Sequence, residues 1–173
     1  MVIDAKNKTA TVAIPAKSIM SIQLSGISGV AHEAAAVQDN EFYQIIGKQS
    51  RLAVSRIAQG DSALSLSQPA IESASAKNQI WKFTPADVTS AVRSSLRAYT
   101  LSAPDGRVLV QRGETNALAD PDSAEARSSA VRWILNTENG SEWQIVNAFV
   151  NSHARQALDV DGSKSVPGTQ VGM

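Results

Sequence analysis

The N-terminal part of the chain alternates apolar residues with small or polar ones, in the manner of β-strands. The main apolar positions all carry even numbers: Val12, Ile14, Met20, Ile22 and Leu24. Pro15-Ala16 interrupts the alternation, so the pattern predicts a two-stranded β-hairpin over residues 9–24. Because two strands with a single apolar face are marginal alone in water, this hairpin needs a partner sheet.

A small and polar stretch follows this hairpin. Residues 25–40 contain two glycines and few large apolar side chains, which is typical of a linker, and His32 within it is expected to be solvated. We therefore expect a segment of β-strands over 1–30, a linker over 31–40 and a further domain over 41–173.

Short apolar runs separated by turn residues recur from residue 41 to the end of the chain. The first set of predicted strands comprises 43–46, 51–54, 64–66 and 79–83. The second set comprises 99–101, 108–110 and 131–135, and the third comprises 143–145, 158–160 and 168–171. Several short strands with turn signals between them predict an all-β domain.

The spacing of apolar residues supports three repeats. Tyr43 precedes Leu52 by nine residues, and Tyr99 precedes Val108 by the same distance. In the third repeat the segment from Trp143 to its second strand is longer. No apolar run that could form a fourth strand follows in the third repeat, so we expect this repeat to be incomplete. We also expect the chain to be a fragment at both ends.

Two short helices are expected as insertions between strands. Thr84 and Pro85 resemble an N-cap followed by a first helical residue, and apolar residues then recur at helical spacing over 85–97. Asp120-Pro121 similarly predicts a short helix over 121–127.

Composition excludes several classes of function. The 16 basic and 16 acidic residues cancel, which argues against nucleic acid or an acidic membrane surface as a partner. With no cysteine and only two histidines, no metal-ligand spacing and no disulfide framework is present, and we expect no cofactor. No apolar run approaches the roughly 20 residues that span a bilayer. Neither a phosphate-binding loop nor a nucleophile elbow is found.

Three motifs carry a resemblance to a known family. Gln79-Ile80-Trp81 matches the Gln-x-Trp tripeptide of ricin-type lectins, and Val131-Arg132-Trp133 is a variant of it. Leu158-Asp159-Val160, followed by Gly168-Thr169-Gln170-Val171, matches the "L-D-V … G-T-x-V" run of the same family. From residue 41 onward the chain therefore resembles a ricin-type β-trefoil lectin, a ricin B-like carbohydrate-binding module. This resemblance implies a closed barrel with three hairpin caps, in which Trp81, Trp133 and Trp143 fill the core.

A shorter resemblance concerns the N-terminal segment. The run VAIPAKSIMSIQLSGISGV over residues 12–30 is similar to the last strands of the β-sandwich that flanks the catalytic barrel of glycoside hydrolase family 30, including its endo-β-1,6-galactanase-like members. A generic β-hairpin remains the alternative. The run contains no catalytic residue of that family.

The lectin resemblance implies where sugar would bind. In such repeats an acid in "L-D-V" accepts hydrogen bonds from two sugar hydroxyls, and amide side chains complete the polar contacts. That acid is Asp159 in the third repeat, whereas spacing places Ala53 and Leu109 at this position in the first two repeats. We expect carbohydrate-binding residues at Asp159, Gln170 and Asn147. Asp159 could instead be an exposed turn residue that hydrogen-bonds its own loop.

Together these features predict a carbohydrate-binding module of a secreted glycoside hydrolase. The expected partner is a polysaccharide or oligosaccharide, with galactose-containing ones favoured, and the chain is expected to be monomeric and extracellular. No catalytic residues are expected in this chain, because catalysis would belong to a separate barrel. The alternative is a structural or protein-interaction β-trefoil without a sugar site, which the absence of an acid in the first two repeats favours.

Overall fold

The chain divides into two compact units, Met1–His32 and Glu33–Met173. The computed structural model describes residues 2–4, 9–11, 37–57, 62–71, 74–86, 98–137, 142–148 and 156–173. In the N-terminal unit, β1 (Val2–Asp4) pairs with β2 (Thr9–Thr11) as an antiparallel ladder. The remainder of the hairpin predicted over residues 9–24 lies outside the described residues.

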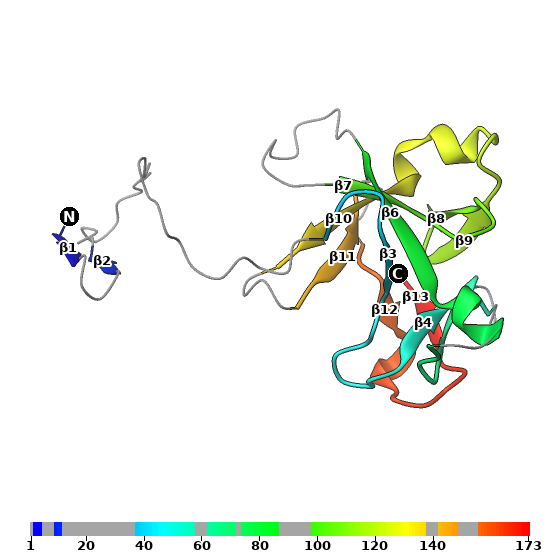
Figure 1. Ribbon diagram of the computed structural model, residues 1–173, viewed down its shortest axis with the longest axis horizontal. Helices are drawn as coiled ribbons and strands as arrows, with labels where there is room; N and C mark the ends of the chain where they lie inside the picture. Colours follow the sequence, from blue (N-terminus) through cyan, green and yellow to red (C-terminus); the bar gives the residue numbers. More distant parts are fainter. Residues whose placement is uncertain are drawn as a thin grey trace. The chain divides into compact units, whose positions relative to one another are not determined.

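The larger unit is built from two antiparallel sheets, which confirms the all-β prediction (Figure 1). The seven-stranded sheet has the order β11-β10-β7-β6-β3, with β8 added to β7 and β9 added to β8. The four-stranded sheet has the order β12-β13-β5-β4. In chain order, the strands of the two sheets are β3 (Phe42–Gln44), β4 (Ala53–Ser55), β5 (Leu64–Ser67), β6 (Ile80–Ala86), β7 (Ala98–Ser102), β8 (Val108–Arg112), β9 (Thr115–Ala119), β10 (Arg132–Asn136), β11 (Gln144–Asn147), β12 (Asp159–Val160) and β13 (Gln170–Gly172).

One backbone pattern recurs three times along this unit. In each repeat the end of the first strand donates a backbone hydrogen bond to the start of the second. The pairs are Gly47 N to Leu52 O, Ala103 N to Arg107 O and Asn147 N to Gln156 O, at 2.9, 2.8 and 2.8 Å. The second and third strands then form a hairpin in all three repeats, β4–β5, β8–β9 and β12–β13. The chain therefore contains three structural repeats.

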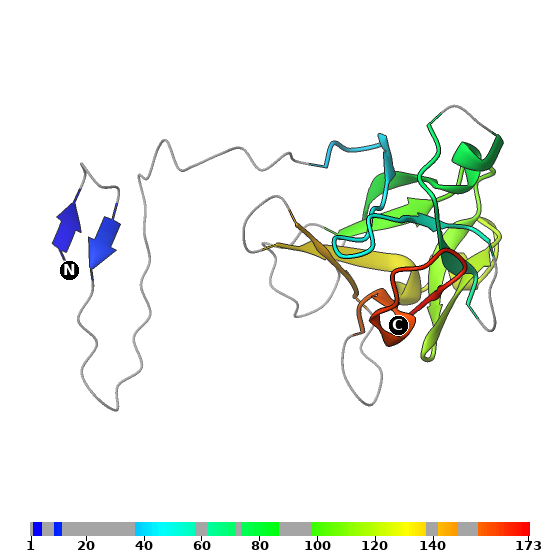
Figure 2. The ribbon, with the colours of Figure 1, turned by 90° about the horizontal axis from the view of Figure 1, so that it is seen from below.

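The first strand of each of the first two repeats pairs with the fourth strand of the same repeat. These pairs are β3 with β6 and β7 with β10. Each fourth strand also pairs with the first strand of the next repeat, as β6 does with β7 and β10 with β11. Figure 2 shows β10 and β11 as two adjacent gold strands at one side of the unit. Because of this double pairing, consecutive repeats share one continuous sheet.

The shared backbone pattern corrects the alignment of the repeats that spacing had predicted. Leu158 N donates to Ile145 O, and Val54 N donates in the same way to Ile45 O. Leu158 therefore corresponds to Val54, and the residue that corresponds to Asp159 is Ser55, not Ala53. The turn before β4 is one residue longer than the turn before β8, so equal spacing from the opening tyrosines misaligned the two repeats.

The second repeat is corrected in the same way. Trp81 Nε1 donates to Val54 O at 3.3 Å in the first repeat, and Trp133 Nε1 donates to Leu109 O at 3.0 Å in the second. Leu109 therefore corresponds to Val54 and Leu158. The counterpart of Asp159 in the second repeat is Val110, not Leu109.

The larger of two buried apolar clusters in the described part of the unit receives side chains from all three repeats. Its buried members are Leu52, Val54, Leu64, Leu66, Trp81, Phe83, Tyr99, Leu101, Leu109, Trp133 and Val171. Trp81 and Trp133 are fully buried, as predicted for the core. The same prediction is wrong for Trp143, whose side chain is 37% exposed just before the edge strand β11.

Strand β3 is anchored to its neighbours by aromatic rings and by the segment that precedes it. The Tyr43 ring meets the Phe83 ring edge-on at 5.5 Å between centroids. The Tyr43 hydroxyl accepts a hydrogen bond from Gln38 N at 2.8 Å, and the Tyr99 hydroxyl donates to Val37 O at 3.3 Å. The last residues of the predicted linker are thus fastened to the sheet.

The two predicted α-helices are not found in the part of the chain that the structure describes. Thr84 and Pro85 continue strand β6 and pair with Thr100 and Tyr99, so the predicted cap at Thr84 is wrong, and residues 87–97 lie outside the described residues. The helix predicted over 121–127 is replaced by two 3₁₀-helices, η2 (Glu125–Arg127) and η3 (Ser129–Val131). Extended backbone at Ser128 separates them, which prevents a continuous helix.

Candidate functional site

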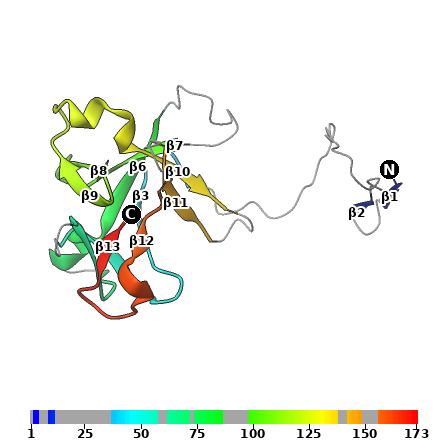
Figure 3. The same cartoon turned by 180° about the vertical axis from the view of Figure 1, so that it is seen from behind.

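The candidate site lies on the β12–β13 hairpin of the third repeat, whose two strands are labelled in Figure 3. Asp159 on β12 is the cross-strand partner of Gly172 on β13, so their outward positions lie on the same face. Gln170 lies two residues before Gly172, and alternation along the strand places it on that face as well. The structure therefore brings two of the three predicted site residues, Asp159 and Gln170, to one surface.

The loop between the two strands is held by residues with unusual backbone angles. The short 3₁₀-helix η4 (Asp161–Ser163) places Gly162 and Ser163 at φ of 59° and 53°. Gly168, at φ of 86°, turns the chain back toward β13, and its N–H donates to Leu66 O at 2.7 Å. Thr169 O accepts from Leu66 N at 2.8 Å. These two bonds fasten the loop to the first repeat and fix the start of β13 at Gln170.

Asp159 is the carboxylate on this face that is open to a ligand. Its side chain is exposed, and among the described residues its carboxylate makes no hydrogen bond or ion pair. The nearby Asp161 forms an exposed ion pair with Lys164, with 3.5 Å between Oδ2 and Nζ. Asp159 therefore keeps its acceptor capacity, whereas Asp161 shares its charge with a neighbouring cation.

The third predicted residue, Asn147, lies elsewhere. It is completely buried at the end of β11, and its Nδ2 donates to Ala130 O at 2.8 Å. This bond links the start of the third repeat to the 3₁₀-helices of the second. The position fits a structural role, and the side chain does not reach the face that carries Asp159.

In the first repeat the corresponding face is covered. Ser55, the counterpart of Asp159, is buried, and its Oγ has no hydrogen-bond partner among the described residues. The 3₁₀-helix η1 (Ala74–Asn78) is attached beside it, because Arg56 N donates to Asn78 O at 2.8 Å and the Arg56 guanidinium donates to Lys77 O. A ligand has no access to Ser55 in this arrangement.

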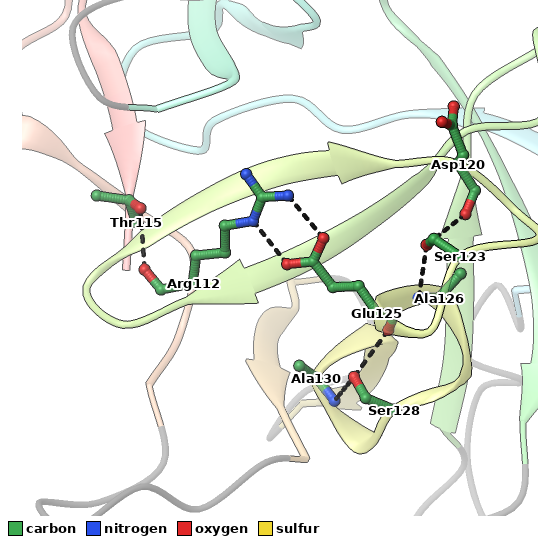
Figure 4. Close-up of polar contacts among 8 residues, drawn as sticks. All are labelled: Arg112, Thr115, Asp120, Ser123, Glu125, Ala126, Ser128 and Ala130. Atoms are coloured by element: carbon green, nitrogen blue, oxygen red, sulfur yellow. Dashed lines mark hydrogen bonds and ion pairs between the residues drawn. The ribbon is translucent and has the colours of Figure 1, made fainter.

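In the second repeat the same face is apolar as well as covered. Val110 is buried together with Val108, Ala119 and Val131, and η2 and η3 lie over β8. Arg112 fastens this cover through two hydrogen bonds of 2.6 Å to the carboxylate of Glu125, as Figure 4 shows. The second repeat therefore offers no acceptor at this position.

Among the described residues, two carboxyl groups have lowered pKa values. Hydrogen bonds from the Arg112 side chain lower the pKa of Glu125. Hydrogen bonds from Arg107 similarly lower the pKa of Asp105, with a smaller contribution from Arg56. Both carboxylates are occupied by arginine side chains and belong to contacts that hold the fold. Neither one is an available acid or base.

Other chemistry is not apparent in the described ranges. No group of three or more His, Cys, Asp or Glu residues is arranged to hold a metal ion there. Within the same ranges, no helix is long and apolar enough to cross a membrane.

Comparison with known proteins finds a relative that is much longer than this chain. The chain is 45% identical over 175 aligned residues to an exo-β-1,6-galactobiohydrolase of Bifidobacterium longum subsp. longum. The match covers 100% of this chain but only 11% of that relative. The chain thus aligns with one part of this relative and spans about a tenth of its length. No family model matches the chain.

Proposed function

We propose that this chain is a carbohydrate-binding accessory module of an extracellular glycoside hydrolase, with one saccharide site on its third repeat. The module itself catalyses no reaction and holds its parent enzyme near a polysaccharide. Gln170 contributes a polar contact beside Asp159, which is the principal hydrogen-bond acceptor for sugar hydroxyls. Because one shallow site binds weakly, useful retention comes from tethering to the parent enzyme and to a polymeric ligand.

One observation carries the proposal. Of the three corresponding positions Ser55, Val110 and Asp159, the first two are buried, and the third is an exposed carboxylate without a partner among the described residues. An ionised carboxylate accepts charge-assisted hydrogen bonds from vicinal hydroxyls, and such bonds are worth about 1.5–3 kcal/mol each. A saccharide site is therefore supported in the third repeat and not in the others.

The threefold recurrence of pairing supports a β-trefoil of the ricin B type for residues 41–173. In a trefoil each repeat contributes four strands, and this chain supplies four in each of the first two repeats and three in the last. The motif Gln79-Ile80-Trp81 lies at the start of β6, with Trp81 in the core as that family requires. This order supports a trefoil to which the described residues contribute three strands of the third repeat.

The relative supports the choice of ligand. An exo-β-1,6-galactobiohydrolase acts on β-1,6-linked galactose, so a galactose-containing polysaccharide is the first candidate. The extracellular site of action is part of the proposal, because the module would meet a polymeric ligand there.

Binding of the 173-residue chain to immobilised polysaccharides, including β-1,6-galactan, tests the proposal. Asp159→Ala is the key variant, and Asp161→Ala is its matched control because Asp161 lies on the same loop and is already paired with Lys164. We expect retention on a galactan that falls at least tenfold in the first variant and changes little in the second. Circular dichroism and tryptophan fluorescence establish that each protein is folded.

The opposite result has a definite meaning. If a folded chain is retained on no glycan, or if Asp159→Ala binds like the wild type, the saccharide site is refuted. The module would then be a structural or protein-interaction domain of its parent protein.

A further inference from the structure

The face around Asp159 has a second feature that its two counterparts lack. Its cross-strand partner is Gly172, whereas Ser55 is paired with Ser65 and Val110 with Ala117. A side chain at this position would stand directly beside that of its partner. The absence of a side chain at Gly172 therefore leaves open space next to the Asp159 carboxylate. Of the three repeats, the third is the one with a carboxylate at this position.

A neighbouring repeat borders this space. The carbonyl oxygen of Glu114, in the turn between β8 and β9, lies 3.7 Å from where a Cβ on Gly172 would be. The same oxygen accepts a hydrogen bond from Met173 N at 3.3 Å, which holds the turn against the end of β13. The turn is the one next to Thr115 in Figure 4. The Glu114 side chain is exposed and, among the described residues, has no hydrogen-bond or ion-pair partner.

On the basis of the proposed saccharide function, we propose that Gly172 and Glu114 complete the Asp159 site and make it selective for neutral saccharides. Gly172 admits the sugar ring beside the carboxylate, and the second repeat supplies the opposite wall through the turn at Glu114. The site is therefore shared by two repeats. Glu114 is a specificity-determining residue, and its charge adds to that of Asp159.

The charges of this surface give the direction of the selectivity. Asp159 and Glu114 are both acidic, and the nearby cation Lys164 is paired with Asp161. A neutral sugar donates its hydroxyl hydrogens to such a surface at no electrostatic cost. A sugar that carries its own carboxylate is repelled, by a factor of about two to three for each like charge several ångströms away in water. The site should thus favour neutral galactose over its uronate.

Two variants separate this inference from an ordinary effect on folding. A Cβ at Gly172 would be in ordinary van der Waals contact with Glu114 O, and Gly172 is not among the residues with positive φ, so Gly172→Ala should fold normally. Glu114→Gln changes only an exposed side chain. Glu41→Gln, which removes the same charge from an exposed residue ahead of β3, is the matched control.

The experiment measures the affinity of each protein for β-1,6-linked galactobiose and for the same disaccharide with its terminal C6 oxidised to a carboxylate, at low salt. We expect Gly172→Ala to weaken binding of the neutral sugar at least fivefold with an unchanged unfolding midpoint. Glu114→Gln should reduce the preference for the neutral sugar two- to threefold, and Glu41→Gln should not change it.

The inference is overturned if Asp159→Ala abolishes binding while Gly172→Ala and Glu114→Gln bind and discriminate like the wild type. That result would leave the proposed function intact. Failure of the wild type to bind either sugar would refute both proposals. If Gly172→Ala lowered the unfolding midpoint, the selectivity of Glu114→Gln would decide the question alone.

Discussion

Asn116 and Val171 join the second and third repeats through a buried hydrogen bond. Asn116 Nδ2 donates to Val171 O at 2.7 Å, and the two residues are 1% and 2% exposed. Ser62 of the first repeat completes the junction, because its Oγ lies 2.7 Å from Asn116 Oδ1 and also contacts Val171 O. One asparagine thus connects all three repeats at a point that water does not reach.

Replacement of this asparagine by leucine should destabilise the larger unit. Asn116→Leu is close in size but leaves Val171 O without its amide donor and Ser62 Oγ with one partner fewer. Unsatisfied buried groups cost about 1–3 kcal/mol. The free energy of unfolding, measured in urea, should fall by about that amount. Asn136→Leu, at an exposed position on β10, is the control and should change it by less than about 0.5 kcal/mol. Equal effects of the two variants would show that the junction contributes nothing particular.

Gln79 and Val131 occupy corresponding positions two residues before Trp81 and Trp133, yet their surroundings are opposite in polarity. Gln79 is buried, with its Nε2 donating to Ser67 Oγ at 2.7 Å and to Gln68 O at 2.6 Å, while its Oε1 accepts from Ala70 N at 2.8 Å. Val131 is buried in an apolar cluster. The Gln-x-Trp glutamine is therefore a loop anchor in the first repeat.

A reciprocal exchange tests this assignment. Gln79→Val should lower the free energy of unfolding by about 1–3 kcal/mol, because the loop after β5 loses its polar partners. Val131→Gln should destabilise by a similar amount for the opposite reason, since it buries an amide without partners. Urea unfolding of both variants measures the two effects. A neutral result for Gln79→Val would mean that water satisfies the loop in place of the glutamine.

Local apolar patterns predicted the all-β class, and the resemblance to Gln-x-Trp repeats implied the burial of Trp81 and Trp133. It failed where the answer depends on backbone pairing. Equal spacing from Tyr43 and Tyr99 suggested Ala53 as the counterpart of Asp159, and a one-residue difference between two turns moved the correspondence to Ser55. Thr84 and Pro85 carry a helix-start signal, but pairing with β7 keeps them in a strand.

The candidate site was predictable only in part, for a similar reason. Asp159 and Gln170 belong to one local motif, so their shared face follows from strand alternation. Asn147 is a polar residue that precedes this motif in the third repeat, but its side-chain amide donates a hydrogen bond to Ala130 O inside the fold. Glu114 comes from another repeat, and no local pattern indicates that its carbonyl lies beside Gly172.

Ser55 provides a prediction of increased stability. Its buried Oγ has no hydrogen-bond partner, so the folded state bears the cost of removing that hydroxyl from water. Ser55→Ala deletes the hydroxyl and should leave the unit as stable or more stable, by up to about 1 kcal/mol. Ser67→Ala is the matched comparison, because Ser67 Oγ accepts a hydrogen bond from Gln79 and its loss should destabilise. A clear loss of stability in Ser55→Ala would indicate that the hydroxyl has a partner after all, such as an ordered water.

The ion pair between Arg112 and Glu125 should make stability depend on pH in the acid range. The pKa of Glu125 is lowered in the folded state by hydrogen bonds from Arg112, so folding is favoured when the carboxylate is ionised. This contribution to stability is complete above the ordinary glutamate pKa of about 4.3. It is lost as the pH falls through the lower pKa that Glu125 has in the folded state. The Arg112 and Glu125 side chains are 56% and 32% exposed, so solvent screens the pair and its contribution is small.

Urea unfolding of the wild type and of Glu125→Gln at a series of pH values between 7 and 3 measures this dependence. The wild type should be the more stable of the two at neutral pH, because only the ionised carboxylate accepts both arginine hydrogen bonds. The difference should shrink as the pH falls below about 4, where protonation of Glu125 removes the charge that the variant already lacks. A difference that stayed constant across the series would show that Glu125 stabilises η2 through packing rather than through its charge.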